Sequence, residues 1–328
     1  MTDGETVLVT GGCGSIGSAI VRSFLQERSS CSVHVVDHNE HNLFTFEREL
    51  ARFGDRVRFT LADVRERDSL VTAMGDAETV VHTAGLKHVP LNESFPYEAV
   101  KTNVTGTQHV IEAARHAGVE TVLGLSTDKA VTPTSTMGAT KMLAERLLIA
   151  ADAEAGDDDP AFGCIRLGNM IESNGSVYRT FADQIARGGP VTITHPEMTR
   201  FILPYSDAVA FVHTTLEELD GGEIHVPKMD AVRIEEVAKV MIDRYGDPGP
   251  PGIDLEVIGI RPGERLHERL FSDVEVRYAV EESDRYVLSP ALETASPRHD
   301  PDEMTVPPSS ETASHLTREE IDGLLAEF

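Results

Sequence analysis

Residues 6–17 read Thr6-Val7-Leu8-Val9-Thr10-Gly11-Gly12-Cys13-Gly14-Ser15-Ile16-Gly17, and a helix-like pattern follows them. The short apolar run that ends at Thr10 is typical of a buried strand. Glycines at positions 11, 14 and 17 suit a tight strand-to-helix turn, in which the backbone approaches a pyrophosphate and a helix N-terminus faces its charge. The stretch therefore predicts a dinucleotide site made by Gly11, Gly14, Ser15, Ile16 and Gly17.

The first 170 residues alternate strand-like and helix-like segments, which is typical of a doubly wound α/β domain with a parallel sheet. Apolar runs predict strands at Thr6–Thr10, Ser32–Asp37, Val57–Leu61, Thr79–Thr83, Thr121–Ser126 and Phe162–Leu167. Helical periodicity predicts helices at Ile16–Gln26, Glu40–Arg52, Arg67–Met74, Tyr97–His116 and Met137–Ala150, with Asn39 as the N-cap of the second.

From about Gly168 the pattern loosens, although Ile234–Tyr245 still predicts a helix. We therefore expect a dinucleotide-binding domain at residues 1–168 and a smaller substrate-binding portion at residues 169–293, from which the chain can cross back to the first core. Residues 294–328 are expected to form a mobile segment and a short terminal helix, because a Pro- and Ser-rich stretch precedes the capping-box pattern of Thr317 and Glu320.

Asp37 ends the second expected strand, twenty residues after Gly17. A carboxylate at this point hydrogen-bonds the adenosine ribose and repels a 2′-phosphate, and no arginine lies between residues 29 and 47 to offset it. We therefore expect NAD rather than NADP. Asp63 and Val64 are expected near the adenine and Ala84 near the nicotinamide ribose, although an ordinary loop role stays open for them.

The overall charge restricts the partners. The chain of 328 residues has 29 basic and 55 acidic side chains and a net charge of −26, which argues against nucleic acid or an anionic membrane as partner. Only six of the basic residues are lysines. Because concentrated salt screens the repulsion between so many acidic side chains, we expect a salt-loving source. No long apolar run or signal peptide is present, and three widely spaced cysteines predict neither disulfides nor a metal site, so a cytoplasmic location is expected.

Asp128 and Lys129 follow the fifth expected strand, and eight residues after Lys129 the chain reads Met137-Gly138-Ala139-Thr140-Lys141. A methionine thioether cannot take or give a proton, so a reaction at this point needs another acid and another base. The adjacent carboxylate and amine at the end of the strand are candidates for both.

These strings together resemble the extended short-chain dehydrogenases of the CapD-type polysaccharide-biosynthesis group, which are UDP-N-acetylglucosamine 4,6-dehydratases and their relatives. The resemblance spans roughly residues 5 to 275. It rests on Gly11–Gly17, Val36–Glu40, Gly85–Pro90, Lys101–Val104, Ser126–Lys141, Gly168–Asn169, Gly175–Val177, Gly188–Thr192, Thr194–Arg200 and Arg261–Glu264. It implies a Rossmann sheet with a smaller C-terminal subdomain for a UDP-sugar, NAD as cofactor and a homo-oligomer.

The resemblance also implies a reaction. The cofactor takes hydride from sugar C4, Lys129 removes the C5 proton, Asp128 protonates the departing O6 hydroxyl, and hydride returns to C6. Lys141 binds the nicotinamide ribose and Thr127 contacts the oxygen at C4. Met137 occupies the position at which the superfamily usually has a catalytic tyrosine.

For the substrate, the resemblance implies a set of binding residues. Asn169, Ser176 and Val177 would contact the sugar and the diphosphate. Arg200 and Arg261 would pair with the diphosphate, and Glu264 would bind the uridine ribose. Lys87 and His88 either reach the sugar or order their loop. Glu172 stands where the family usually has Gly and Asn174 where it often has Arg, which leaves the identity of the sugar open.

Two other functions remain possible on the sequence. A nucleotide-sugar epimerase also oxidises C4, but simple 4-epimerases of this superfamily depend on the missing tyrosine. A non-catalytic NAD- or nucleotide-sugar-binding regulator needs neither acid nor base, whereas this chain has kept Asp128, Lys129 and Lys141. Both comparisons favour dehydration.

Overall fold

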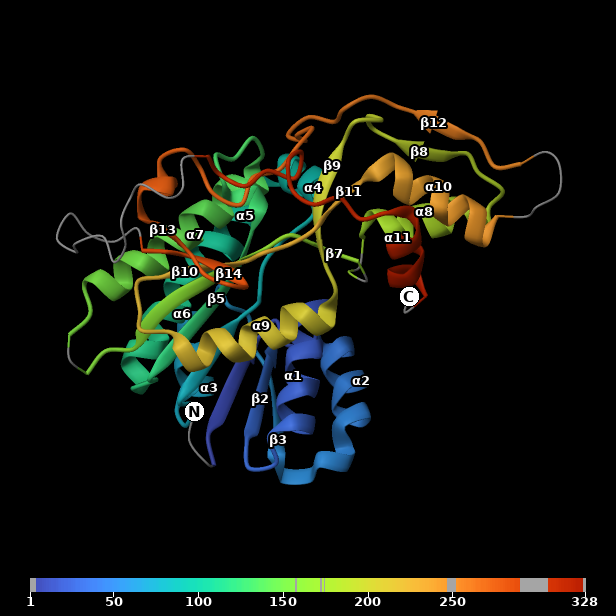
Figure 1. Cartoon of the computed structure of the whole chain (residues 1–328). Helices are drawn as coiled ribbons and strands as arrows, with labels where there is room; N and C mark the ends of the chain where they lie inside the picture. Colours follow the sequence, from blue (N-terminus) through green and yellow to red (C-terminus); the bar gives the residue numbers. More distant parts are fainter. Residues whose placement is uncertain are drawn as a thin grey trace.

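The computed structural model describes residues 4–156, 158–171, 173, 175–246, 252–289 and 306–326. Within these ranges the largest sheet has nine strands, with helices against both of its faces (Figure 1). Its strands are β1 (Thr6–Thr10), β2 (Ser32–Asp37), β3 (Val57–Leu61), β4 (Thr79–His82), β5 (Thr121–Thr127), β6 (Ala161–Leu167), β10 (Ile224–Pro227), β13 (Ala279–Glu281) and β14 (Arg285–Leu288).

Two small sheets lie beyond the carboxyl ends of these strands. One contains β7 (Asn169–Met170), β9 (Thr199–Leu203) and β11 (Ala231–Arg233), and the other contains β8 (Val191–Ile193) and β12 (Leu255–Val257). The helices are α1 (Ser15–Glu27), α2 (Glu40–Leu50), α3 (Arg67–Met74), α4 (Val89–Ser94), α5 (Pro96–Ala99), α6 (Gly106–Ala117), α7 (Thr136–Ala153), α8 (Val177–Ala186), α9 (Tyr205–Glu218), α10 (Ile234–Tyr245) and α11 (Arg318–Leu325). Short 3-10 turns are η1 (Ala51–Arg56), η3 (Asp128–Ala130) and η4 (Glu275–Tyr278), and η2 (Val100–Thr105) is a π-helical turn.

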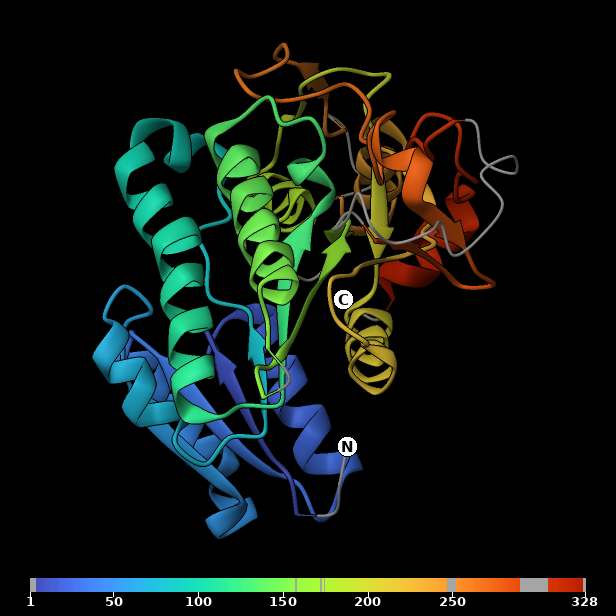
Figure 2. The ribbon, with the colours of Figure 1, turned by 90° about the vertical axis from the view of Figure 1, so that its left-hand side faces the viewer.

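The order of the large sheet is β13-β14-β10-β6-β5-β4-β1-β2-β3. Strands β1 to β6 and β10 are parallel, and β14 pairs antiparallel with β10. Helices α1 and α9 contact each other on one face, whereas α3, α6 and α7 follow one another on the opposite face (Figure 2). The order reverses between β1 and β4, which is where doubly wound sheets bind ligands. The expected fold class is confirmed.

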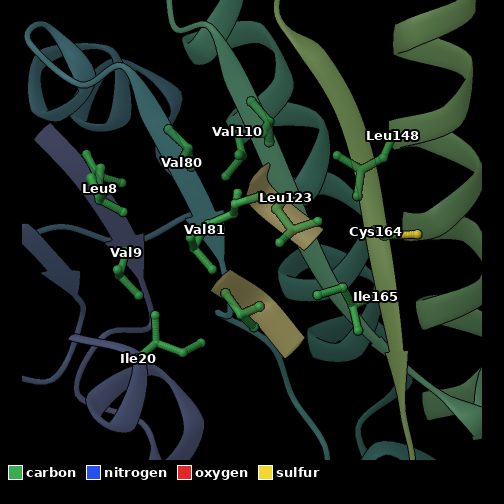
Figure 3. Packing of buried hydrophobic residues seen from close by; sticks show 14 of the residues in the cluster. Leu8, Val9, Ile20, Val80, Val81, Val110, Leu123, Leu148, Cys164 and Ile165 are labelled. Atoms are coloured by element: carbon green, nitrogen blue, oxygen red, sulfur yellow. The ribbon is translucent and has the colours of Figure 1, made fainter. Parts of the chain in front are cut away.

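The core of this sheet consists of the aliphatic runs that predicted its strands. Figure 3 shows side chains of β1, β4, β5 and β6 packed together with Ile20, Val110 and Leu148 from the covering helices. Burying one such side chain stabilises the fold by about 1.5–3 kcal/mol. A second apolar cluster lies under the small sheets and joins α8, α10 and α11, with Phe181, Val237 and Ile321 among its members.

The predicted elements compare closely with the structure. β1, β2, β3, α3 and α10 have the predicted end residues, Asn39 caps α2, and Thr317 and Glu320 form the capping box of α11. The stretch predicted as one helix at Tyr97–His116 is helical throughout, but it is divided into α5, the π turn η2 and α6. α6 begins at Gly106, where a Cβ atom would come within 2.9 Å of Val64, so the chain approaches β3's loop more closely than a larger residue allows.

The C-terminal stretch from residue 306 runs along the rest of the molecule. Leu270 donates its amide to the Pro308 carbonyl, and Leu316 donates its amide to the Ala231 carbonyl. Residues 290–305, which contain the start of the segment predicted to be mobile, lie outside the described residues. No helix in the described ranges is long and apolar enough to cross a membrane.

Candidate active site

A first cavity lies at the carboxyl ends of β1 to β4 and is lined by Gly11, Gly14, Asp37, Asp63, Val64 and Ala84, among others. Gly11 has φ +65°, and a Cβ atom there would lie 2.7 Å from the backbone of Ala84. A Cβ atom on Gly17 would collide with the Gly11 carbonyl oxygen. Glycine is therefore required at both positions for β1 to turn into α1, and the first turn of α1 contains no acidic side chain that would repel a phosphate.

Asp37 is held at the edge of this cavity by the glycine turn itself. Its carboxylate accepts hydrogen bonds from the amides of Cys13 (3.1 Å) and Asn39 (3.0 Å). This fixes a negative charge where the adenosine ribose of a dinucleotide would lie, and it disfavours a 2′-phosphate. Next to it, the Arg65 guanidinium bonds to Asp63 and holds the pKa of that carboxyl below its usual range, and it also reaches Glu98 at 2.9 Å.

A second cavity continues from Ile16 and Thr83 towards β5 and α7, and Lys141 lies at its base. The Lys141 ammonium donates to the Leu125 carbonyl at 2.9 Å, and burial lowers its pKa to about 8, although the charge of Glu145 opposes this shift. Asn103 fixes the loop above it, because its side-chain oxygen accepts from the Leu86 amide and its nitrogen donates to Thr140 on α7. The structure thus brings an ammonium to the expected nicotinamide end.

Thr127, Asp128 and Lys129 form one hydrogen-bonded group where β5 ends. Asp128 is fully buried, and its Oδ1 accepts from the Thr127 hydroxyl and from the Lys129 ammonium, both at 2.9 Å. Lys129 Nζ also donates to Asn169 Oδ1 at 2.6 Å. Thr127 and Lys129 line the second cavity, whereas Asp128 lines none of the three cavities and reaches them through its two hydrogen bonds. A carboxylate, an amine and a hydroxyl are therefore held in one hydrogen-bonded group, as acid–base chemistry requires.

Met137 lies in the first turn of α7, buried and on the wall of the same cavity. Ser135 caps this helix, and a Cβ atom on Gly138 would collide with the Lys129 carbonyl, so α7 begins directly against η3. Tyr178 also lines this cavity, and its hydroxyl forms no hydrogen bond within the described ranges. Burial raises the pKa of its phenol, which disfavours the ionised form.

A third cavity opens towards the small sheets and shares Lys129, Asn169 and Val177 with the second. The residues predicted to bind substrate each line at least one of these two cavities: Lys87, His88, Asn169, Ser176, Val177, Arg200, Arg261 and Glu264. Among the predicted cofactor residues, Ser15 and Gly17 do not line any of the three cavities. Gly17 acts through close packing of α1, as its position in the turn predicts.

The two arginines predicted to bind the diphosphate differ in the hydrogen bonds that they already form within the protein. Arg200 is buried and donates to the carbonyls of Thr199, Leu266 and Arg265. Arg261 is exposed, and its backbone amide donates to Glu264 at 3.0 Å. Arg261 is thus the freer of the two guanidinium groups to meet a diphosphate, whereas Arg200 mainly fixes the wall behind it.

The start of α8 faces the loop after β4. Ser176 caps α8, with its hydroxyl accepting from the Arg179 amide and donating to the Ile171 carbonyl. Gly175 has φ +76°, and a Cβ atom there would collide with the His88 ring. His88 therefore lies against the α8 entry on the cavity wall. Glu172 and Asn174, which depart from the family pattern, lie outside the described residues.

Some residues at the site received no role from the sequence. Asn103 belongs to one of the quoted strings but was given no function, although it ties the Leu86 loop to α7. Arg265 and Glu268, four and seven residues after Arg261, line the third cavity together with Lys129. The sequence gives only a weak indication that a charged residue just after the Arg261–Glu264 string belongs to the site, because its burial depends on contacts with distant segments.

The model of the family described as polysaccharide biosynthesis protein matches residues 7–290. The chain belongs to this family. The family agrees with the resemblance that the sequence strings indicated.

Individual relatives are similar over most of their length. An uncharacterised membrane protein of Methanocaldococcus jannaschii is 45% identical over 87% of this chain and 86% of its own. A UDP-N-acetylglucosamine 4,6-dehydratase (inverting) of Campylobacter jejuni is 35% identical over 92% of this chain and 87% of its own. A UDP-glucose 4-epimerase of Rickettsia rickettsii is 36% identical over 86% and 82%. Identity alone therefore does not separate dehydration from epimerisation.

Solved structures show the same fold. Pen from Bacillus thuringiensis has a TM-score of 0.91 and 32% identity, and the alignment covers 99% of this chain and 98% of Pen. MoeE5 in complex with UDP-glucuronic acid and NAD has a TM-score of 0.65 and 27% identity over 80% of this chain and 88% of its own.

Proposed function

We propose that this protein is an NAD-dependent nucleotide-sugar 4,6-dehydratase that acts on UDP-N-acetylglucosamine and forms a 4-keto-6-deoxy sugar for polysaccharide or glycan biosynthesis. The observation that carries the proposal is the hydrogen-bonded Thr127–Asp128–Lys129–Asn169 group, of which Lys129 and Asn169 line both the second and the third cavity, beside a methionine in place of tyrosine. The similarity to the Campylobacter jejuni dehydratase supports the substrate class.

The first cavity suits NAD because its glycine turn, helix N-terminus and Asp37 match the pyrophosphate and ribose of that cofactor. The nicotinamide supplies reversible hydride transfer when it is bound. Lys141, at the base of the adjoining cavity, would hold its ribose, and the Asn103-bound loop would cover it. The complex of MoeE5 with NAD supports this use of the fold.

Proton transfers fall to the chain's own side chains. Lys129 removes the C5 proton once the sugar carries a ketone at C4, because the ketone makes that proton acidic. Asp128 gives a proton to the O6 hydroxyl as it leaves, and Asp128 Oδ2 is free of other hydrogen bonds within the described ranges. Thr127 contacts the oxygen at C4, and Asn169 holds the Lys129 ammonium in place.

An epimerase is the second candidate, because the Rickettsia rickettsii protein is as similar as the dehydratase. A 4-epimerase needs one acid–base group at the C4 oxygen and none at C5 or C6. The site has a thioether at the tyrosine position and a carboxylate–amine pair instead. The acid and base are therefore those that an elimination needs.

The test is incubation of the purified protein with UDP-N-acetylglucosamine and NAD, followed by mass spectrometry of the product. Loss of one water is the expected result, whereas an isomer of unchanged mass means epimerisation. In D2O, deuterium should enter at C5, because the proton taken by Lys129 exchanges with solvent. Absence of any product, although NAD and UDP-sugar both bind, would support the regulator instead.

The acidic composition supports a salt-loving source. At 1 M salt the Debye length falls to about 3 Å, so the repulsion expected at a net charge of −26 is largely screened. We expect activity and thermal stability to be higher in 2 M KCl than in dilute buffer, as measured by product formation and thermal unfolding. An optimum in dilute buffer would contradict this expectation. Three free cysteines support a reducing cytoplasm as the location.

Self-association stays a prediction. Large apolar side chains are exposed on consecutive elements that contact one another: Leu91 (57%), Phe95 (59%) and Tyr97 (82%). Exposed apolar side chains grouped in this way often mark a contact between subunits. Analytical ultracentrifugation in high salt should show a species of at least twice the 35.7 kDa chain mass.

A further inference from the structure

Glu268 is a buried carboxyl group that the mechanism above does not use. Its side chain is 3% exposed, and it lines the third cavity together with Lys129 and Arg200. Its Oε1 lies 3.8 Å from Nε of Arg200, and its Oε2 has no hydrogen-bond partner among the described residues. A buried carboxylate oxygen without a partner is costly and uncommon in native proteins, so it needs a reason.

The backbone holds Glu268 firmly in this position. The Glu268 amide donates to the Ser310 hydroxyl, and the Ser310 amide donates back to the Glu268 carbonyl, both at 2.9 Å. The Ser310 hydroxyl also lies 2.8 Å from the hydroxyl of Thr199 on β9. The C-terminal stretch therefore fixes the Glu268 backbone against β9, and the carboxyl group is oriented by the fold.

Four charged groups act on Glu268 from its surroundings. Burial raises the pKa of Glu268; the cations of Lys129, Arg200 and Arg265 lower it, and the charge of Asp128 raises it further. The net direction is upward, so Glu268 holds its proton at higher pH than an exposed glutamate does. Asp128 likewise has one oxygen, Oδ2, free of partners in the described part of the chain.

The proposed dehydration gives this arrangement a task, and the following step rests on that function. Oxidation at C4 releases the proton of the O4 hydroxyl. Elimination consumes one proton, because hydroxide leaves C6 as water. The C5 proton is removed and later replaced. Asp128 is therefore left without its proton in each turnover and must be reloaded.

We propose that Glu268 reloads Asp128 by passing it a proton after water has left. In this step the O–H bond of the Glu268 carboxyl group breaks and an O–H bond forms on Asp128, either directly between the two free oxygens or through one water. The proton released from O4 then returns to Glu268 through solvent in the cavity. Protons balance over the cycle, and no further reactant is required.

The test is Glu268→Gln, which keeps the size and polarity of the side chain but cannot give up a proton as a carboxylic acid does. We expect kcat for water release to fall about 100-fold, the low end of acid–base contributions. KM for UDP-N-acetylglucosamine should stay within about twofold, since Arg261 and Glu264 are unchanged. In a rapid mix, about one water per active site should be released at the wild-type rate, because the first elimination precedes the reloading step. Reduced nicotinamide should then accumulate, because oxidation at C4 precedes the second elimination, which needs the reloaded acid.

Two variants separate this role from a structural one. Glu268→Asp should recover part of kcat, because it restores a carboxyl group on a shorter stem. Glu5→Gln removes the charge from a buried carboxylate at the opposite end of β1 and should leave kcat unchanged. If wild-type protein releases water and Glu268→Gln does so within threefold, the inference is overturned and the proposed function stands. If wild-type protein releases no water, the proposed function itself fails.

Discussion

Replacing Lys129 with methionine tests the proposed base most directly. Methionine keeps most of the length of the lysine stem and removes the ammonium, which donates to Asp128 at 2.9 Å and to Asn169 at 2.6 Å. General acid–base groups contribute about 10²–10⁴-fold, so the barrier to water release should rise by about 3–5 kcal/mol. Oxidation at C4 should be affected less, because that step does not involve the C5 proton.

The same change also affects stability, and the structure gives the size of the effect. Asp128 is fully buried, and the substitution leaves its carboxylate with only the Thr127 hydroxyl as donor. Removing one partner of a buried ion pair costs about 3–5 kcal/mol. Because the Lys129 side chain is 23% exposed, solvent screening should reduce this loss to about 2–3 kcal/mol. The double variant Asp128→Asn, Lys129→Met removes the unpaired charge and should recover most of this loss without recovering activity.

The assay follows product mass and NAD affinity in parallel. Lys129 does not line the first cavity, so the Kd for NAD, measured by fluorescence titration, should stay within about twofold. Lys228→Met, which removes a lysine paired with Glu281 outside the three cavities, is the matched control and should keep wild-type turnover. Water release within tenfold of wild type, or an equal loss of NAD binding, would refute the role of Lys129 as base.

Three further changes test other parts of the structure. Asp37→Ala should weaken NAD binding about 10–100-fold, since a hydrogen bond to a charged group contributes about 1.5–3 kcal/mol, and should reduce the preference over NADP in a fluorescence titration. Arg166→Met leaves Glu145 and Glu275 buried without their shared guanidinium, so urea unfolding should show a loss of about 3–5 kcal/mol. Burial lowers the pKa of His82 from 6.5 to about 3, so the unfolded chain binds a proton below pH 6.5 that the folded chain does not, and stability falls as the pH drops through this window. At pH 5 that loss is about 2 kcal/mol, and His82→Gln should remove it relative to pH 7.5.

The sheet could be predicted because its signals are local. Parallel strands buried on both faces are continuous apolar runs, and β1 and β2 begin and end at the predicted residues. The edge strand β3 also has the predicted end residues, although none of its side chains is fully buried. The turn at Gly11 was equally predictable, since its positive φ and close contact with Ala84 require glycine. The division of the helical stretch Tyr97–His116 was less predictable, because periodicity does not show where α6 must approach Val64.

The interior of the site depends on contacts between distant segments, which a single sequence does not show. Arg166 lies in a strand predicted from its apolar neighbours, and its partners Glu145 and Glu275 come from α7 and η4. Glu268 is held in place by the C-terminal stretch from residue 306, whose Ser310 hydroxyl accepts from the Glu268 amide. The sequence could place Asp128 and Lys129 at the end of β5, but it could not show that a second carboxyl group lies near them.

The number of proton transfers explains why this site carries so many ionisable groups. An epimerase that oxidises and reduces C4 handles one proton at one oxygen, and a single tyrosine is sufficient for that. A dehydratase needs a base at C5, an acid at O6 and a means of reloading that acid. Here Met137 removes the single group that epimerisation requires. Lys129 and Glu268 line one cavity, and Asp128 is hydrogen-bonded to Lys129 behind that wall. Burying two carboxyl groups with unpartnered oxygens is unfavourable for the fold alone, and the chain retains both at the place where dehydration consumes a proton.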